Sequence, residues 1–222
     1  QYSGMGKELF DLSPIFRFNL LRCETILKDE LPIKLTDLIF KTEHRHLLNE
    51  TQYTQVAICC LSYSLYQLLL AYEIKASVVC GHSIGEYVAA CISGVMKLED
   101  MLQIVARRGK LMQSLPKETG MISVMTNRYV AENLLKENNI ELEVAVVNSD
   151  LQTVFAGVNN EIKKAIKLFD NNNILNIQLS VSHAFHSKVM NPILEEFNDY
   201  IKLRSLNDAK IPIYRNKTGL IA

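Results

Sequence analysis

Residues 81–87 read Gly-His-Ser-Ile-Gly-Glu-Tyr, and they follow directly on an apolar run at residues 77–80, Ser-Val-Val-Cys. The apolar run predicts a strand and the residues after the glycines predict a helix, so Ser83 stands at the tip of a tight turn. Gly81 and Gly85 lack a Cβ where the backbone bends sharply and the next element approaches closely. This pattern is typical of a nucleophile elbow, which exposes the serine Oγ and directs the following backbone N–H groups at a developing oxyanion.

The composition is that of a globular protein without a strong electrostatic field. The chain has 222 residues, is 48% hydrophobic, and has 24 Lys and Arg residues against 24 Asp and Glu residues. This balance gives no support to nucleic-acid or membrane-surface binding. The longest apolar stretch, residues 56–72, contains two serines and a glutamine, so we interpret it as a buried helix and not as a membrane span. We therefore expect a cytoplasmic protein.

The five cysteines are an odd number and lie in apolar runs, at Cys23, Cys59, Cys60, Cys80 and Cys91. This pattern favours small buried hydrophobic side chains in a reducing compartment over a disulfide framework. Their spacing also gives no metal site, so we expect no metal.

The pattern of the chain changes after a break at residues 116–120. Short apolar runs then alternate with amphipathic ones in the order βαββαβ, which is the ferredoxin-like unit. The expected strands are 121–126, 142–147, 153–156 and 174–179, and the expected helices are 130–137 and 161–169. The second helix has apolar residues at i, i+3, i+4 and i+7, namely Ile162, Ala165, Ile166 and Phe169.

These elements predict an α/β protein with two subdomains. The large subdomain is α/β-hydrolase-like with a parallel sheet; it comprises residues 1–119, with the elbow at 81–85, and a return segment, 181–222. The small ferredoxin-like subdomain comprises residues 120–180. The chain starts at Gln1 without a methionine, and its last strand-like run enters a turn close to the end. We therefore expect a piece of a longer protein that lacks its last elements.

A serine nucleophile needs a base that takes its proton. Two of the five histidines lie in a polar stretch, and His82 is inside the elbow, where alternation would point its side chain away from Ser83. The remaining pair, His183 and His186, belongs to the sequence His-Ala-Phe-His-Ser just after a predicted strand. Spacing alone does not choose between these two histidines.

A pair of arginines, Arg107-Arg108, lies in a predicted helix that begins near residue 98. Most arginine pairs are a solvated helix face. Alternatively, one guanidinium turns inward and binds a substrate carboxylate with its planar fork of donors. The sequence pattern leaves both interpretations open.

Taken together, the motifs resemble those of a known family. The segments Gln-Tyr-Ser-Gly-Met-Gly (1–6), Gly-His-Ser-Ile-Gly-Glu (81–86), Ala-Arg-Arg-Gly-Lys-Leu-Met-Gln (106–113), His-Ala-Phe-His-Ser (183–187) and Asn-Lys-Thr-Gly (216–219) occur in the expected order. The chain is similar to acyltransferase domains of modular polyketide synthases, relatives of the malonyl-CoA:acyl-carrier-protein transacylase of fatty acid synthesis. The resemblance covers essentially all 222 residues.

The resemblance implies a role for each matching residue. Ser83 would be the acylated nucleophile and His186 the general base, while Arg108 would hold the free carboxylate of the extender unit. The backbone N–H of Ile84 would supply half of the oxyanion hole. The other half comes, in this family, from a Gly-Gln-Gly turn just upstream of the position that Gln1 matches, so Gln1 is expected near the site.

The resemblance also implies a preference for malonyl units, because His-Ala-Phe-His goes with malonyl and Tyr-Ala-Ser-His with methylmalonyl in this family. Phe185 would fill the space beside the substrate α-carbon, although one methyl group discriminates by only about 1–3 kcal/mol. His183 and Ile84 are further expected specificity residues. His82, Gly81, Gly85 and Asn216 are expected to be structural residues near the site.

The expected reaction carries a malonyl group from malonyl-CoA, through a seryl ester, to the phosphopantetheine thiol of an acyl carrier protein, without a cofactor. Further expected partners are the ketosynthase and linker domains of the same synthase. One alternative is a serine esterase, which needs an acidic residue between serine and histidine. Asp100, Asp150 and Asp170 are available, but none follows an obvious core strand of the large subdomain. The other alternative is a non-catalytic docking domain.

Overall fold

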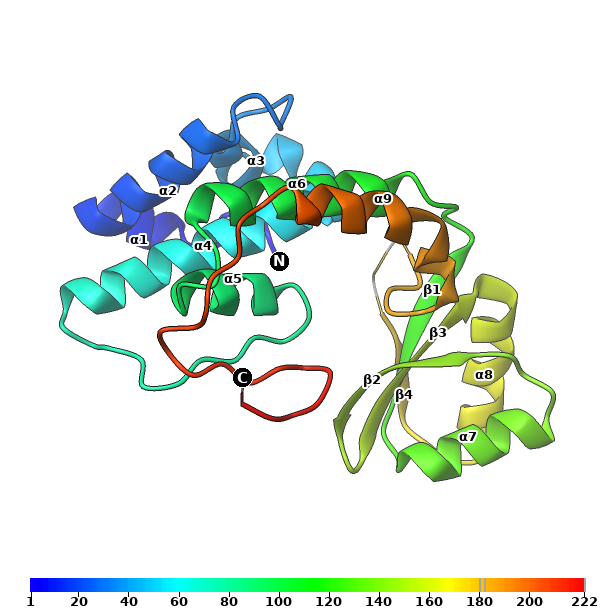
Figure 1. Ribbon diagram of the computed structural model, residues 1–222. Helices are drawn as coiled ribbons and strands as arrows, with labels where there is room; N and C mark the ends of the chain where they lie inside the picture. Colours follow the sequence, from blue (N-terminus) through cyan, green and yellow to red (C-terminus); the bar gives the residue numbers. More distant parts are fainter. Residues whose placement is uncertain (180, 182, 222) are drawn as a thin grey trace. The chain divides into compact units, whose positions relative to one another are not determined.

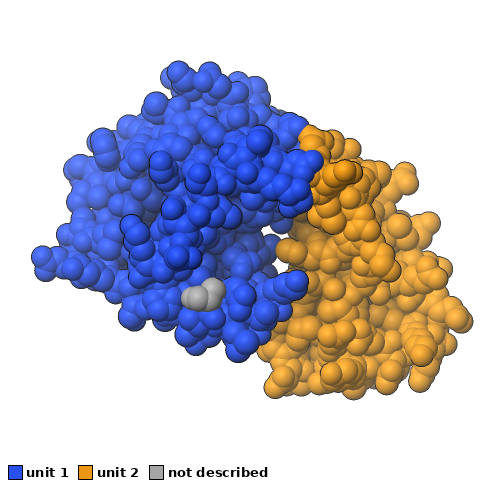
Figure 2. Space-filling view, in the orientation of Figure 1, with its two compact units in different colours: residues 1–111, 197–222 blue, residues 112–196 orange. Residues whose placement is uncertain are grey.

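A computed structural model describes residues 1–179, 181 and 183–221. The chain divides into two compact units, which are residues 1–111 with 197–222 (unit 1) and residues 112–196 (unit 2) (Figure 2). The helices are α1 (Lys7–Leu12), α2 (Pro14–Ile26), α3 (Leu35–Phe40), η1 (Thr42–His44), η2 (Leu47–Asn49), α4 (Thr51–Ala71), α5 (Gly85–Ile92), α6 (Leu98–Gln113), α7 (Arg128–Glu137), α8 (Asn159–Asn171), η3 (Lys188–Met190) and α9 (Asn191–Lys202). The strands are β1 (Thr119–Val124), β2 (Glu143–Ser149), β3 (Gln152–Val158) and β4 (Asn176–Gln178).

The core of unit 1 is built around α4, against which α2 and α5 pack (Figure 1). Helix α4 is long and apolar enough to span a membrane by length and composition. In this fold it is a core helix, as its apolar sequence predicts, with buried side chains that include Val56, Cys59 and Cys60. They pack with buried side chains of α2, α3 and α6, such as Leu20, Leu38 and Met101.

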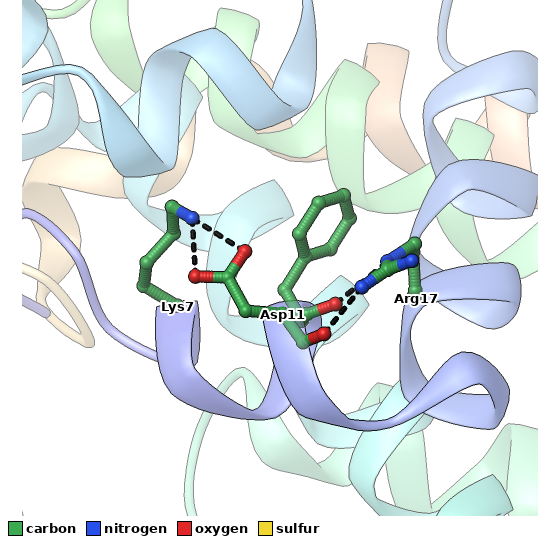
Figure 3. Close-up of polar contacts among 4 residues, drawn as sticks. Lys7, Asp11 and Arg17 are labelled. Carbon is green, nitrogen blue, oxygen red and sulfur yellow. Dashed lines mark hydrogen bonds and ion pairs between the residues drawn. The ribbon is translucent and has the colours of Figure 1, made fainter.

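A polar corner joins the first two helices of unit 1 (Figure 3). Pro14 occupies the first turn of α2, where its missing N–H costs nothing, and the Ser13 hydroxyl accepts from the N–H of Phe16 at 3.2 Å. Arg17 donates to the carbonyl oxygens of Phe10 and Asp11, which end α1 without helical partners. The corner therefore satisfies backbone groups at the end of one helix and at the start of the next.

The return segment of unit 1 pairs with the strand that leads into the elbow. Val79 forms a parallel bridge with Ile213, donating to the Pro212 carbonyl and accepting from the Tyr214 N–H, each at 2.9 Å. The predicted strand at residues 77–80 is thus reduced to one bridged residue. Three residues before Ile213, the N–H of Lys210 donates to the carbonyl of Ser93 at 2.7 Å. This bond attaches the return segment to the residue that follows α5.

Unit 2 contains a four-stranded antiparallel sheet in the order β2-β3-β1-β4. Its elements follow one another as βαββαβ, which confirms the predicted ferredoxin-like unit. In the central pair Ile122 lies opposite Phe155, and both are buried against α7 and α8. Of the four apolar residues predicted for α8, Ile162, Ala165 and Phe169 are fully buried and Ile166 is partly buried against the same cluster.

The other face of the sheet is covered by the chain that follows β4. Met121, Val154 and Ala156 alternate with the residues of the first face, and they pack with Ala184 and Phe185. Unit 2 is therefore wider than the expected range of 120–180, because residues after 180 contribute to its core. Residue 180 itself lies outside the described residues.

The α/β fold class with a parallel pairing in one part and an antiparallel sheet in the other is confirmed.

The expectation that all five cysteines are buried is wrong for Cys80, which is exposed at the end of the bridged run. Cys80 follows the bridged residue Val79 and lies outside the parallel pairing that the structure describes. Cys23, Cys59 and Cys60 are buried as predicted, and Cys91 is partly buried.

Candidate active site

The turn from the bridged residue Val79 into α5 needs a residue without a Cβ at Gly81. A Cβ there would lie 2.1 Å from the carbonyl oxygen of Gly85, which no side chain tolerates. The expectation of a similar close approach at Gly85 is wrong. Apart from its chain neighbours and the nearby backbone of α5 itself, no described atom comes within 4 Å of the position that a Cβ on Gly85 would take.

Ser83 is held in a left-handed backbone conformation, with φ of 50°. A residue with a Cβ adopts this conformation at a cost of about 1–3 kcal/mol, and such residues concentrate at functional sites. Two backbone bonds close the turn, from Gly85 N–H to His82 O at 2.9 Å and from Glu86 N–H to Ser83 O at 3.0 Å. The strain at the predicted nucleophile is therefore enforced by the tight turn around it.

Ile84 caps the start of α5, where backbone N–H groups have no helical partner. In the described part of the chain, no backbone carbonyl accepts from the Ile84 N–H. This donor directly follows the strained serine, which is the place that an oxyanion donor must take in a nucleophile elbow. The His82 side chain, on the other side of Ser83, is exposed.

Asn216 connects the return segment to both sides of the elbow. Its Nδ2 donates to the Gly81 carbonyl at 2.6 Å and to Glu86 Oε2 at 2.8 Å, and its backbone N–H donates to Glu86 Oε1 at 3.0 Å. The structure thus brings Asn216 to the elbow. Glu86 is a neighbour that sequence reasoning missed, although its position directly after the motif's second glycine is visible in the sequence.

Arg108 is placed beside the elbow helix by the close packing of α6 on α4. A Cβ at Gly109 would lie 2.8 Å from Cα of Gln52, so only glycine permits this approach. One turn along α4, Gln55 Oε1 accepts from Arg108 Nη1 at 2.6 Å. The Arg108 guanidinium carbon lies 5.7 Å from the ring centroid of Tyr87 in α5.

The two arginines diverge, which the sequence pattern left open. Arg107 lies against α9, its guanidinium carbon 5.9 Å from the ring centroid of Tyr200. Burial raises the pKa of Tyr87, and the positive charge of Arg108 opposes that shift. Tyr87 therefore stays a neutral phenol that offers its ring face to the Arg108 guanidinium. Gln55 and Tyr87 were missed by sequence reasoning, and Gly109 is the signal that could have pointed to them.

The two histidines of unit 2 have opposite environments. His183 is fully buried, and its Nε2 lies 3.0 Å from the carbonyl oxygen of Leu115. Burial lowers the pKa of His183, so its ring is neutral at pH 7. His186 is exposed and has a left-handed backbone, with φ of 58°. Of the pair, His186 is thus the one with an accessible ring.

The segment that carries these histidines is anchored at several points. The Ala184 N–H donates to Thr119 Oγ1 at 3.0 Å, and the Ser187 hydroxyl donates to the Ala184 carbonyl at 2.7 Å. Phe185 is partly buried, packs on the sheet face, and its ring centroid lies 6.1 Å from that of His183. The hydrogen bonds hold the backbone on both sides of Phe185.

Unit 1 brings together Ser83, Ile84, Asn216 and Arg108, whereas His183, Phe185 and His186 belong to unit 2. The approach of His186 to Ser83 stays a prediction. Gln1 lies in unit 1, where its Nε2 contacts Asn49 Oδ1 at 3.4 Å, and its position near the oxyanion also stays a prediction.

Of the three carboxylates that a serine esterase could use, Asp100 belongs to unit 1, and Asp150 and Asp170 belong to unit 2. Asp100 is 3.9 Å from Arg204 Nε, Asp170 accepts from Asn176 Nδ2 at 2.8 Å, and Asp150 stands in the turn between β2 and β3. Within residues 1–179, 181 and 183–221, no group of three or more His, Cys, Asp or Glu side chains is placed to hold a metal ion.

Known proteins resemble the chain along its whole length. It is 30% identical over 226 residues to polyketide synthase GfsA of Streptomyces halstedii, and 33% identical over 224 residues to mycoketide-CoA synthase of Mycobacterium tuberculosis. Each alignment covers 100% of this chain but only 3% and 5% of those proteins. The chain therefore spans a small part of the curated relatives it matches.

Solved structures also match the whole of this chain, and this chain covers only part of each of them. The acyltransferase domain from the second module of the salinomycin polyketide synthase superposes with a TM-score of 0.91 at 30% identity, over 100% of this chain and 52% of that one. The malonyl CoA-acyl carrier protein transacylase from Clostridium perfringens superposes with a TM-score of 0.86 at 29% identity, over 100% of this chain and 70% of that one. A family model described as "Acyl transferase domain" matches residues 1–219, and the chain belongs to this acyl transferase family.

Proposed function

We propose that the chain is part of an enzyme that transfers a malonyl group from malonyl-CoA to the phosphopantetheine thiol of an acyl carrier protein, in polyketide synthesis. The observation that carries this proposal is the strained Ser83 at a strand-to-helix turn whose helix also contacts Arg108. A nucleophile and a fixed guanidinium in one unit fit an acyl group that ends in a free carboxylate. A neutral ester would offer no carboxylate to the Arg108 guanidinium.

The first half-reaction forms a seryl ester. His186 takes the proton of the Ser83 hydroxyl as Oγ attacks the thioester carbonyl, and the carbonyl oxygen becomes an oxyanion that accepts from the Ile84 N–H. When the tetrahedral intermediate collapses, the C–S bond breaks and the CoA thiolate receives the proton from His186. Gln1 lies near the second half of the oxyanion hole in this scheme.

The second half-reaction reverses these steps with a new thiol. His186 takes the proton of the phosphopantetheine thiol, the sulfur attacks the seryl ester, and Ser83 Oγ leaves with that proton. Phe185 fills the space beside the α-carbon, with His183 and Ile84 as further specificity residues, which favours malonyl over larger units. This chemistry needs no metal or redox cofactor. We expect a cytoplasmic enzyme that acts with the ketosynthase and linker domains of the same synthase.

We expect the full-length protein to gain one malonyl group on the peptide that contains Ser83 when it is incubated with malonyl-CoA. Burial raises the pKa of Cys59 and of Cys91 to about 12, so these thiols are poor nucleophiles. Mass spectrometry of digested protein locates the group. The exposed Cys80, three residues before Ser83, is the matched control, and Cys80→Ala should leave acylation intact. A malonyl group on a cysteine would contradict the mechanism.

His186→Ala should abolish acylation of Ser83, whereas His183→Ala should retain a large part of it in the folded fraction. The second change should instead lower the free energy of unfolding by about 1–3 kcal/mol, because a buried hydrogen bond and its packing are lost.

The pKa of His183 is lowered in the folded state, so the unfolded chain binds more protons below pH ~6.5 and stability falls with falling pH there. His183→Ala should flatten this dependence. Equal loss of acylation in both variants would contradict the assignment.

Arg108→Ala should lower kcat/KM for malonyl-CoA roughly tenfold to hundredfold, the equivalent of about 1.5–3 kcal/mol for hydrogen bonds to a charged group. The kcat/KM for acetyl-CoA, which has no free carboxylate, should fall much less. The ratio of kcat/KM between the two substrates therefore shifts towards acetyl-CoA. Competition between the two CoA esters measures this ratio. Arg107→Ala is the matched control and should leave it unchanged. If malonyl transfer fell in Arg107→Ala and not in Arg108→Ala, the carboxylate would be bound by Arg107 and the assignment to Arg108 would be contradicted.

A further inference from the structure

A three-residue hydrogen-bond clamp encloses the strained serine. Asn216 lies in the return segment, and its amide nitrogen bonds to Gly81 before the serine and to Glu86 after it, at 2.6 and 2.8 Å. Its backbone N–H adds a third bond, to the second carboxylate oxygen of Glu86 at 3.0 Å. One side chain from far along the sequence therefore ties together the end of the bridged run and the first turn of α5.

The chemistry of the clamp allows one orientation of the amide. Both groups that face Asn216 Nδ2 are acceptors, a backbone carbonyl and a carboxylate, so only the NH2 end of the amide satisfies them. The Glu86 carboxylate thus sets which end of the amide faces Gly81. An aspartate at position 216 would have the same shape but would place an acceptor between two acceptors.

The place of Asn216 is itself fixed by the backbone around it. Tyr214, two residues earlier, donates to the Val79 carbonyl at 2.9 Å, so the return segment is already paired with the run that enters the elbow. A left-handed residue with a Cβ persists only where its surroundings over-determine it. The clamp supplies that constraint on both sides of Ser83, whose φ is 50°.

We propose that Asn216 and Glu86 are positioning residues for the nucleophile: they hold Ser83 in the left-handed conformation that presents its Oγ, and neither touches the substrate. This inference rests on the proposed function in that Ser83 is the acylated residue. Loss of the clamp lets the turn relax, which moves Oγ away from its attack position while leaving the remaining binding contacts in place.

The test is Asn216→Asp in the full-length protein, with Asn176→Asp as the matched control. Asn176 Nδ2 likewise donates to one carboxylate, Asp170 Oδ1 at 2.8 Å, and to one backbone carbonyl, Ile174 O at 3.1 Å, but in unit 2. We expect Asn216→Asp to lower kcat for malonyl transfer roughly tenfold to hundredfold with KM changed less than about twofold, as misplacement of a reacting atom does. Asn176→Asp should leave both constants within about twofold of wild type.

A second variant tests the part of Glu86. Glu86→Gln combined with Asn216→Asp restores a donor–acceptor pair, because the introduced amide can donate to the introduced carboxylate. The double variant should therefore recover part of the kcat that Asn216→Asp loses, while the Gly81 contact stays broken. No recovery would overturn the role of Glu86, and an unchanged kcat in Asn216→Asp would overturn the whole inference.

A fluorophosphonate probe, which labels activated serines whatever their substrate, separates this inference from the proposed function. Labelling of Ser83 should fall in Asn216→Asp by the same factor as kcat, measured well below the melting temperature of each variant. If the probe labels wild-type Ser83 but malonyl-CoA does not acylate it, malonyl transfer is contradicted. The ratio of probe labelling between Asn216→Asp and wild type would still test the clamp in that case. Equal labelling of wild type and variant would overturn the clamp, and failure of the probe to label wild type would overturn both proposals.

Discussion

A serine with a left-handed backbone must be held where a bridged run meets the first turn of a helix, and the contacts around that turn come from several segments of unit 1. Gly81 removes the Cβ that would strike the Gly85 carbonyl, and backbone bonds from Gly85 and Glu86 close the turn. The return segment then pairs with Val79 and brings Asn216 to both flanks of Ser83. The conformation costs free energy, and we propose that these contacts together hold it.

The position of the Arg108 guanidinium depends on a different constraint, which is the close approach of helices α4 and α6. Gly109 lets α6 meet α4 at Gln52, and this packing brings Arg108 to Gln55 and to the ring of Tyr87. The amide oxygen of Gln55 and the ring of Tyr87 both restrict the orientation of the Arg108 guanidinium. In the mechanism that we propose, the guanidinium therefore binds the substrate carboxylate without ordering a flexible side chain first.

The sequence was sufficient for those parts that depend on local patterns. The alternation and helix periodicity of residues 121–179 predicted the ferredoxin-like unit, and the elbow motif predicted the turn at Ser83. Contacts between segments far apart in sequence could not be predicted this way. The partners of Asn216, the separation of Arg107 from Arg108 and the burial of His183 all depend on where distant helices and strands meet. Cys80 was wrongly placed in the core because a run of apolar residues does not reveal how many neighbours cover it.

The most direct test of the proposed chemistry is a crystal structure of the full-length protein acylated with malonyl-CoA in the absence of carrier protein. We expect an ester on Ser83 Oγ, with Ser83 still left-handed. The acyl oxygen should lie within hydrogen-bond distance of the Ile84 N–H, and the free carboxylate should be paired with the Arg108 guanidinium. An acyl group on another residue, or a carboxylate bound by Arg107 or left in solvent, would contradict the mechanism.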